Sequence, residues 1–221
     1  MSKDEIKRRA CKADLYVFAT EICDYQEVNL RTHGEMLDAL ESRTTRKLIV
    51  MPRGTFKSSL GTVAYSIWRL LNNPNERILI DSEVYTNSKN FLREIKAILQ
   101  SQKFVDLFGD WRGSNWTENE ITVSTRTKPY KEASITAGGI GTVKVGQHYS
   151  IIIGDDYNSG NNSETPEMRA KVIRHYQMNT SILEPTGTYA IIGTRYAVDD
   201  VIGWIMTNEI ENLRPPEGAV I

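Results

Sequence analysis

The feature that most constrains this chain is a short apolar strand followed at once by a basic turn and a helix. The run Lys47–Met51 (KLIVM) is typical of a strand buried on both faces of a parallel sheet. A turn at residues 52–54 follows, and Lys57–Leu71 predicts a helix in which Gly61 is the only breaker. In this order of elements, backbone amides at the helix start can hold an anion. The segment therefore predicts an α/β fold with an anion-binding turn at the edge of its sheet.

Strands and helices alternate along most of the remaining chain. Further strands are expected at Arg77–Ile80, Glu120–Ser124, Glu132–Thr136, Tyr149–Ile153 and Thr188–Ile192. Helices are expected at Lys3–Cys23, at His33–Glu41, at Val201–Ile210, after a Thr86 cap, and after a Thr165 cap that precedes Pro166. This alternation favours an α/β fold with a mainly parallel central sheet flanked by helices.

Length and composition limit the class of protein. The 221 residues suit one α/β domain, and 40% apolar with 25% charged residues excludes a disordered chain. Cys11 and Cys23 lack the spacing of a metal or redox motif, so we expect reduced thiols that serve packing. No apolar run approaches the roughly 18 residues of a membrane span, and the N-terminus lacks an apolar signal core. We therefore expect a cytosolic protein.

The charges nearly cancel, with 27 basic against 28 acidic residues, but the basic ones are unevenly placed. A basic patch can therefore form on a protein whose net charge is close to zero. The two basic stretches are Arg43, Arg46, Lys47, Arg53 and Lys57, and Arg126, Lys128, Lys131 and Lys144.

The basic turn carries three residues suited to phosphate chemistry. Lys57 supplies a cation, Ser58 a hydroxyl that can ligate Mg²⁺, and Gly54 a position where the backbone can bend. The usual phosphate-loop pattern has glycine at both ends, where this chain has Met51 and Phe56. Phe56 fits such a loop if its φ is negative, since its side chain then points away from the phosphate. The alternative for this segment alone is a basic surface turn before a helix.

A second segment, Ile151–Asp156, ends an apolar strand in two adjacent carboxylates. In a nucleotide hydrolase, the first acid at such a strand end, here Asp155, holds Mg²⁺, and the next, Asp156, can polarise the attacking water. The alternative is that paired acids cap a turn. Parallel strands bring Asp155, Asp156, Lys57 and Ser58 to the same carboxyl edge of the sheet, which favours the catalytic interpretation.

A third strand runs into Gly193-Thr194-Arg195-Tyr196. A threonine hydroxyl at such a strand end, here that of Thr194, can sense the γ-phosphate and pass its state to a following element. Taken alone, this segment is also compatible with an ordinary turn.

The motifs MPRGTFKSS, GGIGTVKVGQHYSIIIGDD and GTRYAVDD follow one another in this order, with a Ser-Glu-Thr helix start before the last. With HGEMLDAL and FLREIKAIL, this order resembles the ATPase domain of the large terminase subunit of tailed bacteriophages, over roughly Leu30 to Trp204. The resemblance implies a P-loop NTPase fold of the ASCE, RecA-like kind, with ATP and Mg²⁺ as cofactors.

The resemblance also implies roles for single residues. Lys57 matches the phosphate-loop lysine, Arg53 an arginine that approaches the γ-phosphate, and Thr194 the motif that couples hydrolysis to DNA movement. Asp155 matches the magnesium-binding acid, with Ser58 as the magnesium hydroxyl. Asp156 matches the catalytic carboxylate, which is often Glu in relatives. The nucleotide-binding residues would be Pro52, Arg53, Gly54, Thr55, Phe56, Lys57, Ser58, Ser59 and Thr194, with His33 in the adenine region.

The family uses an arginine finger from a neighbouring subunit, commonly just before the glycine that precedes the acidic strand. Here that neighbourhood reads Val-Lys-Val-Gly, so Lys144 is the candidate, as a charge without the bidentate fork of arginine. Arg126 and Arg169 are further candidates. His33 has an alternative role as a helix cap or packing residue.

By this resemblance, residues 1–213 form the ATPase domain, with 1–45 as a helical lead-in that carries part of the adenine pocket. Residues 214–221 would begin a linker, and nuclease activity is not expected. The expected function is a motor that moves double-stranded DNA into a procapsid through contacts to backbone phosphates. Its partners would be the portal protein, the small terminase subunit and copies of itself in a ring, in the host cytoplasm, with a monomer expected in isolation. The alternatives are a helicase-like or remodelling ATPase and a nucleotide- or DNA-binding module without turnover.

Overall fold

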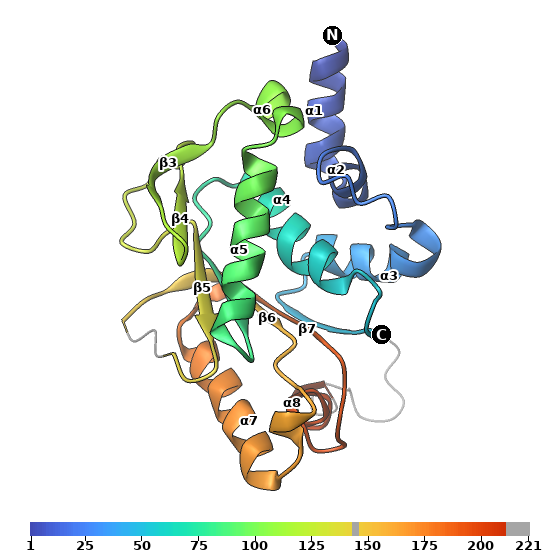
Figure 1. The fold of residues 1–221 in the computed structure, drawn as a ribbon, viewed down its shortest axis with the longest axis vertical. Helices are drawn as coiled ribbons and strands as arrows, with labels where there is room; N and C mark the ends of the chain where they lie inside the picture. Colours follow the sequence, from blue (N-terminus) through green and yellow to red (C-terminus); the bar gives the residue numbers. More distant parts are fainter. Residues whose placement is uncertain (143–145, 211–221) are drawn as a thin grey trace.

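The computed structural model describes residues 1–142 and 146–210 and has an α/β fold (Figure 1). The strands are β1 (Arg46–Val50), β2 (Ile78–Ser82), β3 (Arg112–Trp116), β4 (Glu120–Val123), β5 (Ile135–Gly139), β6 (Tyr149–Asp155) and β7 (Leu183–Gly193). The helices are α1 (Lys3–Ala13), α2 (Leu15–Glu21), α3 (Leu30–Glu41), α4 (Tyr65–Asn72), α5 (Tyr85–Leu99), α6 (Gln102–Phe108), α7 (Pro166–Ser181) and α8 (Val201–Ile205). Short segments are η1 (Ser59–Ala64, π), η2 (Asn161–Ser163, 3₁₀) and η3 (Met206–Ile210, π).

One seven-stranded sheet, in the order β1-β7-β6-β2-β5-β4-β3, organises the molecule. The pairs from β1 to β5 in this order are parallel, while β4 pairs antiparallel with β5 and β3 antiparallel with β4. The expectation of a mainly parallel sheet flanked by helices is confirmed. Because β1, β7, β6 and β2 run in the same direction, the segments that follow them lie at one edge of the sheet.

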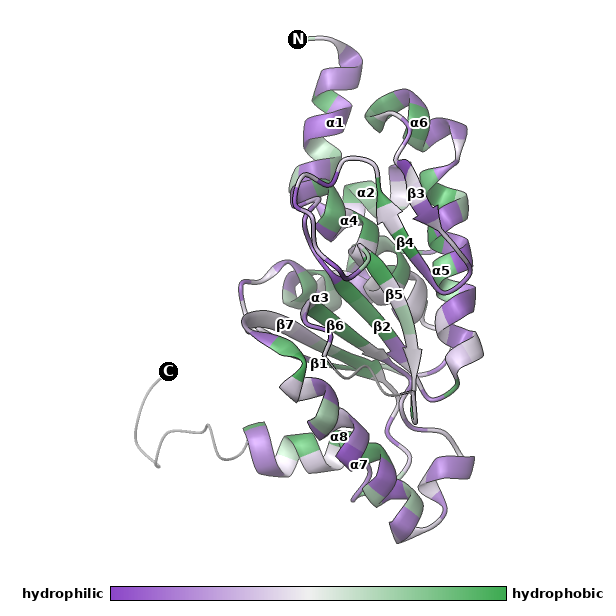
Figure 2. Cartoon of the chain, turned by 90° about the vertical axis from the view of Figure 1, so that its left-hand side faces the viewer, coloured by the Kyte–Doolittle hydropathy of each residue, from purple (hydrophilic) through white to green (hydrophobic). Residues whose placement is uncertain are grey.

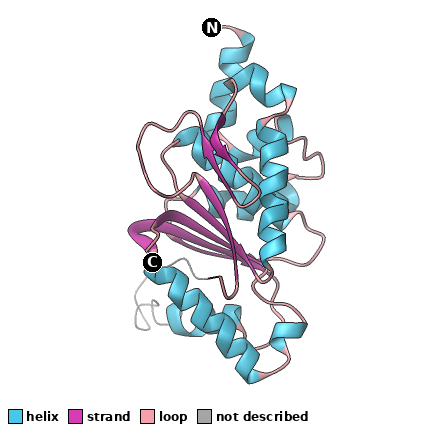
Figure 3. Cartoon of the chain, turned by 60° about the vertical axis from the view of Figure 1, so that its left-hand side comes forward, coloured by secondary structure: helices cyan, strands magenta, loops and turns pink. Residues whose placement is uncertain are grey.

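The central strands face two separate cores. The strands are green, and so apolar, in Figure 2, and Figure 3 shows the magenta sheet between two groups of cyan helices. In β6, Ile151 and Ile153 join the core under α1 to α6, while Ile152 joins the core with α7 and α8. In β2, Leu79 likewise faces the second core, and its neighbours Ile78 and Ile80 face the first. Side chains alternate along a strand, so an apolar run of this kind requires a layer of helices on each face.

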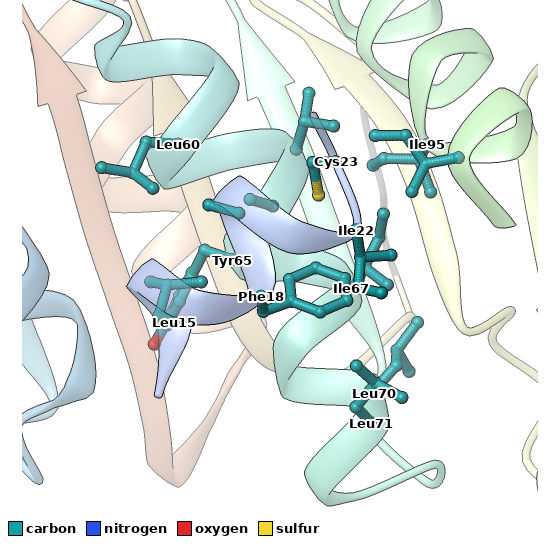
Figure 4. Close-up of a cluster of buried hydrophobic side chains, with 14 of the residues drawn as sticks. Leu15, Phe18, Ile22, Cys23, Leu60, Tyr65, Ile67, Leu70, Leu71 and Ile95 are labelled. Carbon is teal, nitrogen blue, oxygen red and sulfur yellow. The ribbon is translucent and has the colours of Figure 1, made fainter. Parts of the chain in front are cut away.

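The first core joins the N-terminal helices to α4. Phe18 of α2 lies beside Ile67 of α4 (Figure 4), and Leu15 and Leu70 belong to the same core; all four are fully buried. Cys11 and Cys23 are buried free thiols in the same core, as expected. Trp68, Trp111, Trp116 and Trp204 also pack against the cores.

Local chemistry explains two differences from the predicted helices. The helix expected over Lys3–Cys23 is two helices, because Asp14 adopts an extended backbone and its carboxylate accepts a hydrogen bond from the Val17 amide, capping α2. Thr86 is not a cap: α5 begins at Tyr85 after Val84, with no capping side chain. A Cβ at Gly139 of β5 would come within 2.7 Å of the Tyr85 backbone, so the start of α5 packs closely against β5.

The middle of the chain differs most from expectation. The strand expected from Glu132 begins only at Ile135, and α6 and β3 were not expected. Ahead of β5, the Ser134 hydroxyl accepts a hydrogen bond from the Val123 amide, and the Glu132 carboxylate accepts one from the His148 amide. Ahead of Ile135, side-chain hydrogen bonds of this kind stand where a longer β5 would have backbone pairing. The helix expected over Lys57–Leu71 contains the π segment η1, and the linker expected at 214–221 lies outside the described residues.

Within residues 1–142 and 146–210, none of the helices has the length and apolar character needed to cross a bilayer.

Candidate functional site

The basic loop, residues 52–59, leaves β1 through two left-handed backbone positions. Gly54 has φ of 78° and Phe56 has φ of 55°, so the condition under which Phe56 fits a phosphate loop, a negative φ, is not met. A left-handed conformation in a bulky residue costs about 1 to 3 kcal/mol. The Phe56 ring packs against the first core and edge-on to Tyr25, with 6.2 Å between ring centroids. Phe56 thus has a backbone conformation typical of glycine, and its ring is anchored in the core.

His33 supports this loop from α3. It is 3% exposed, its Nδ1 accepts a hydrogen bond of 3.1 Å from the Asn29 amide, and its Nε2 lies 2.9 Å from the Thr55 carbonyl oxygen. Because a carbonyl oxygen only accepts, Nε2 is the donor to Thr55. The Thr55 hydroxyl donates to the Pro52 carbonyl at 2.8 Å. The imidazole therefore links the start of α3, through Nδ1, to the loop backbone, through Nε2.

Lys57, the first residue of the helical stretch that continues into η1, faces Asp156 at the end of β6. Its Nζ lies 3.5 Å from Asp156 Oδ2, and the Lys57 side chain is 6% exposed against 41% for Asp156. Asp156 has φ of 46°, and its amide donates to the Ile192 carbonyl at 2.9 Å. This turn aims the Asp156 carboxylate out of the sheet edge toward the lysine and solvent.

Asp155, the last residue of β6, accepts hydrogen bonds from the end of the basic loop and from the helix that follows it. Ser58 donates to its Oδ1 at 2.9 Å, and Thr62 donates to its Oδ2. Burial raises the pKa of the Asp155 carboxyl to about 6; the adjacent Asp156 acts in the same direction, and Thr62, Ser58 and Lys57 oppose it. Adjacent acids therefore differ in environment: Asp155 is enclosed by hydroxyls, and Asp156 is open to solvent.

The residues around Asp155 fit a magnesium ion that arrives with a phosphate ligand. Across the described ranges 1–142 and 146–210, no cluster of three or more His, Cys, Asp or Glu side chains could hold a metal ion. Mg²⁺ usually takes one or two carboxylates and completes its shell with waters and phosphate oxygens. The Ser58 hydroxyl and the Asp155 carboxylate, in contact with each other, are oxygen donors of this kind.

Two residues after β7 contact the basic loop or the residue just before it. The Thr194 hydroxyl donates to the Met51 carbonyl at 2.9 Å, and the Arg53 guanidinium lies over the Tyr196 ring at 5.3 Å from its centroid. In the sheet, β7 lies between β1, which leads into the basic loop, and β6, which ends in the acids. These contacts therefore connect the segment after β7 to the region of the basic loop.

Two of the candidate finger residues have partners outside the basic loop and the acids. Arg126 donates to the Glu132 and Glu76 carbonyls near the amino ends of β5 and β2, opposite the basic loop. Arg169, in α7, is paired with Asp199 at 2.9 Å. Lys144 lies outside the described residues.

Thr62 and Tyr157 are part of the site's surroundings and were missed in the sequence. Thr62 follows Ser58 by four residues, so the two hydroxyls share one helix face, and that spacing could have found it. Tyr157 directly follows Asp156, and only the fold shows where its hydroxyl lies.

Comparison with known proteins found no matching family model and no matching curated protein, so the site is interpreted from its own geometry.

Proposed function

We propose that this chain is an ATP-hydrolysing motor domain that drives double-stranded DNA into a viral procapsid, like the large terminase subunits its motif order resembles. The strongest support is that two residues of the basic loop contact the two acids at the end of β6, across the intervening strand β7. Lys57 lies 3.5 Å from Asp156, and Ser58 lies 2.9 Å from Asp155. A cation, a hydroxyl and two carboxylates in this arrangement match the needs of phosphoryl transfer to water.

The basic loop would bind the nucleotide phosphates. Backbone amides between Gly54 and Ser58 precede a helical stretch, whose first turn carries partial positive charge. Lys57 adds a full charge at the same place. Its side chain is almost entirely buried, so water screens its ammonium less than that of a surface lysine. Arg53, now over Tyr196, is the further cation within the loop.

Ser58 and Asp155 would hold Mg²⁺, which when bound supplies charge neutralisation at the phosphates. Asp156 would orient and polarise the attacking water, since its carboxylate is exposed and points away from the sheet. Lys57, 3.5 Å away, would hold that carboxylate in place. Asp155 and Asp156 therefore have separate roles that follow from their separate environments.

Coupling to DNA would pass through β7. Thr194 contacts Met51 just before the basic loop, so a change at the phosphates can reach the segment that follows β7. DNA contact would be to backbone phosphates, because a motor must move along any sequence. Partners would be the portal protein, the small terminase subunit and further copies of the chain in a ring.

The test is phosphate release from Mg·ATP by wild type, Lys57→Ala and Asp156→Asn, measured against protein concentration. Both variants should lose turnover. Lys103→Ala, which removes an exposed lysine that pairs with Asp24, is the charge-matched control and should keep it. Full activity of Asp156→Asn would show that its assignment as the catalytic carboxylate is wrong.

Two further outcomes separate the alternatives. Binding of Mg·ATP without turnover by wild type, even with DNA and portal present, would favour a nucleotide-binding module. Turnover per subunit that rises with protein concentration would support a group acting between subunits, and its loss in Lys144→Ala would identify that group.

A further inference from the structure

A buried polar cluster lies directly beneath the turn that carries Asp156. Its centre is Asp81 of β2, which is 1% exposed. Asp81 Oδ2 accepts hydrogen bonds from the Tyr157 hydroxyl at 2.9 Å and from Asn179 Nδ2 at 2.5 Å, and His175 Nε2 lies 2.5 Å away. We call Asp81, Tyr157, His175 and Asn179 the Asp81 cluster. It joins β2, α7 and the residue that follows Asp156.

Burying a carboxylate in this way is costly unless it is well paired. The second core on this side of the sheet is otherwise built from apolar and aromatic side chains such as Ile152, Val172 and Ile202. An apolar residue at Asp81 would extend that packing without the desolvation cost. Stability alone therefore does not account for the Asp81 cluster. Tyr157 belongs to the cluster and directly follows Asp156, which suggests that the cluster positions Asp156.

Tyr157 reaches Asp81 only because the chain folds back at Asp156. The left-handed φ of 46° at Asp156 reverses the chain, and the Tyr157 ring then lies against the backbone of β6. A Cβ at Gly154 would come within 2.6 Å of that ring, so glycine is required there. Two local features, the glycine at position 154 and the left-handed backbone of Asp156, thus allow the Tyr157 hydroxyl to reach Asp81.

Tyr157 is held at both ends. Its hydroxyl contacts Asp81, Asn179 and the Tyr189 hydroxyl, and its carbonyl accepts from Asn162 Nδ2 at 2.7 Å. On the other side, the Asp156 amide is fixed by the Ile192 carbonyl. Asp156 is therefore a single exposed residue between two anchored neighbours, with its carboxylate directed at Lys57.

We propose that Tyr157 is a positioning residue for Asp156, and that His175 and Asn179 of α7 hold it in place through Asp81. This inference rests on the proposed function, in which Asp156 orients the attacking water. A displacement of about 1 Å in such a group can cost on the order of 100-fold in rate. Releasing the Tyr157 hydroxyl should therefore slow hydrolysis and leave nucleotide binding, which depends on the basic loop, intact.

The test compares Tyr157→Phe with Tyr176→Phe. Both replace a buried tyrosine of the second core and remove one hydroxyl, but Tyr176 donates to Glu209, away from Asp156. Phosphate release gives kcat and KM for Mg·ATP, titration with a non-hydrolysable ATP analogue gives Kd, and crystal structures of wild type and both variants give the Lys57–Asp156 distance.

For Tyr157→Phe we expect kcat to fall at least about tenfold, with Kd within twofold of wild type and the Asp156 carboxylate displaced from Lys57. Tyr176→Phe should keep kcat and that distance. Unchanged kcat and geometry in Tyr157→Phe would overturn the inference while leaving the proposed function in place. Should wild type bind without turnover, the proposed function fails, and the Asp156 position in the two variants still decides the positioning role. Asp81→Asn, which keeps the shape of the side chain, provides the same comparison if Tyr157→Phe does not fold.

Discussion

The ammonium of Lys57 lies 3.5 Å from the carboxylate of Asp156, although the two residues follow strands that are not neighbours in the sheet. This ion pair joins the two segments on which the proposed chemistry depends. The predictions below concern the backbone, the hydroxyls and the ionisable groups that hold these segments in place.

Asp156→Asn should lower kcat by about 100-fold or more, which is the usual scale for losing a general base. Asparagine also tolerates a left-handed backbone, so the turn at φ of 46° should persist and the change should be confined to charge. Steady-state phosphate release measures the effect. Equal melting temperatures for wild type and variant would confirm that charge, and not folding, was altered.

Phe56→Gly should be more stable than Phe56→Ala, by about 1 kcal/mol. Both lose the ring packed on Tyr25, but only glycine relieves the left-handed strain at φ of 55°. Urea unfolding of both variants gives the difference. The matched pair Phe91→Gly and Phe91→Ala, within α5, should show the opposite order, since glycine in a helix costs about 1 kcal/mol. The same order at both positions would contradict the role assigned to the Phe56 backbone.

Thr62→Val should destabilise the protein by about 1.5 to 3 kcal/mol, the range for a hydrogen bond to a charged group. Valine matches threonine in shape but leaves Asp155 without the donor to its Oδ2. Thr62→Ser keeps the hydroxyl and should recover most of the stability. Chemical denaturation near neutral pH checks both, and equal losses in the two variants would point to packing and not to the hydrogen bond.

Alkaline pH should unfold the protein through its buried tyrosines. Burial raises the pKa of Tyr149 to about 12, and burial also raises the pKa of Tyr189. The folded state therefore holds protons that the unfolded state releases from about pH 10 upward. Stability should be complete below pH 10 and fall as the pH rises through 12. Phenolate absorbance followed together with circular dichroism tests this, and Tyr149→Phe should reduce the slope.

The sequence was informative wherever a short pattern specified its own geometry. The apolar runs in β6 and β7 predicted central strands, and the run in β1 predicted a parallel strand, which lies at the edge of the sheet. Thr165 with Pro166 predicted the start of α7. The same local reasoning brought Lys57, Ser58, Asp155 and Asp156 to one edge of the sheet. That prediction rested only on the parallel direction of the strands.

What the sequence did not reveal depends on contacts between distant segments. Asp81 reads as an ordinary polar residue at the end of a strand, because its partners His175 and Asn179 are far along the chain. The left-handed Phe56 was missed for a similar reason, since the ring contact with Tyr25 that stabilises it is tertiary. Asp14 is different: a capping aspartate inside an apolar helix pattern was a local signal that could have been used.

The place of β7 between β1 and β6 sets the distance between the basic loop and the two acids that end β6. Adjacent strands lie about 4.8 Å apart, so the ends of β1 and β6 are separated by roughly 10 Å of backbone. That span is fixed by two rows of main-chain hydrogen bonds, and side-chain motion alone cannot widen or close it. A substrate bound by the proposed chemistry would therefore meet two backbone segments whose separation is set by the sheet, with the side chains of Lys57 and Asp156 spanning the gap.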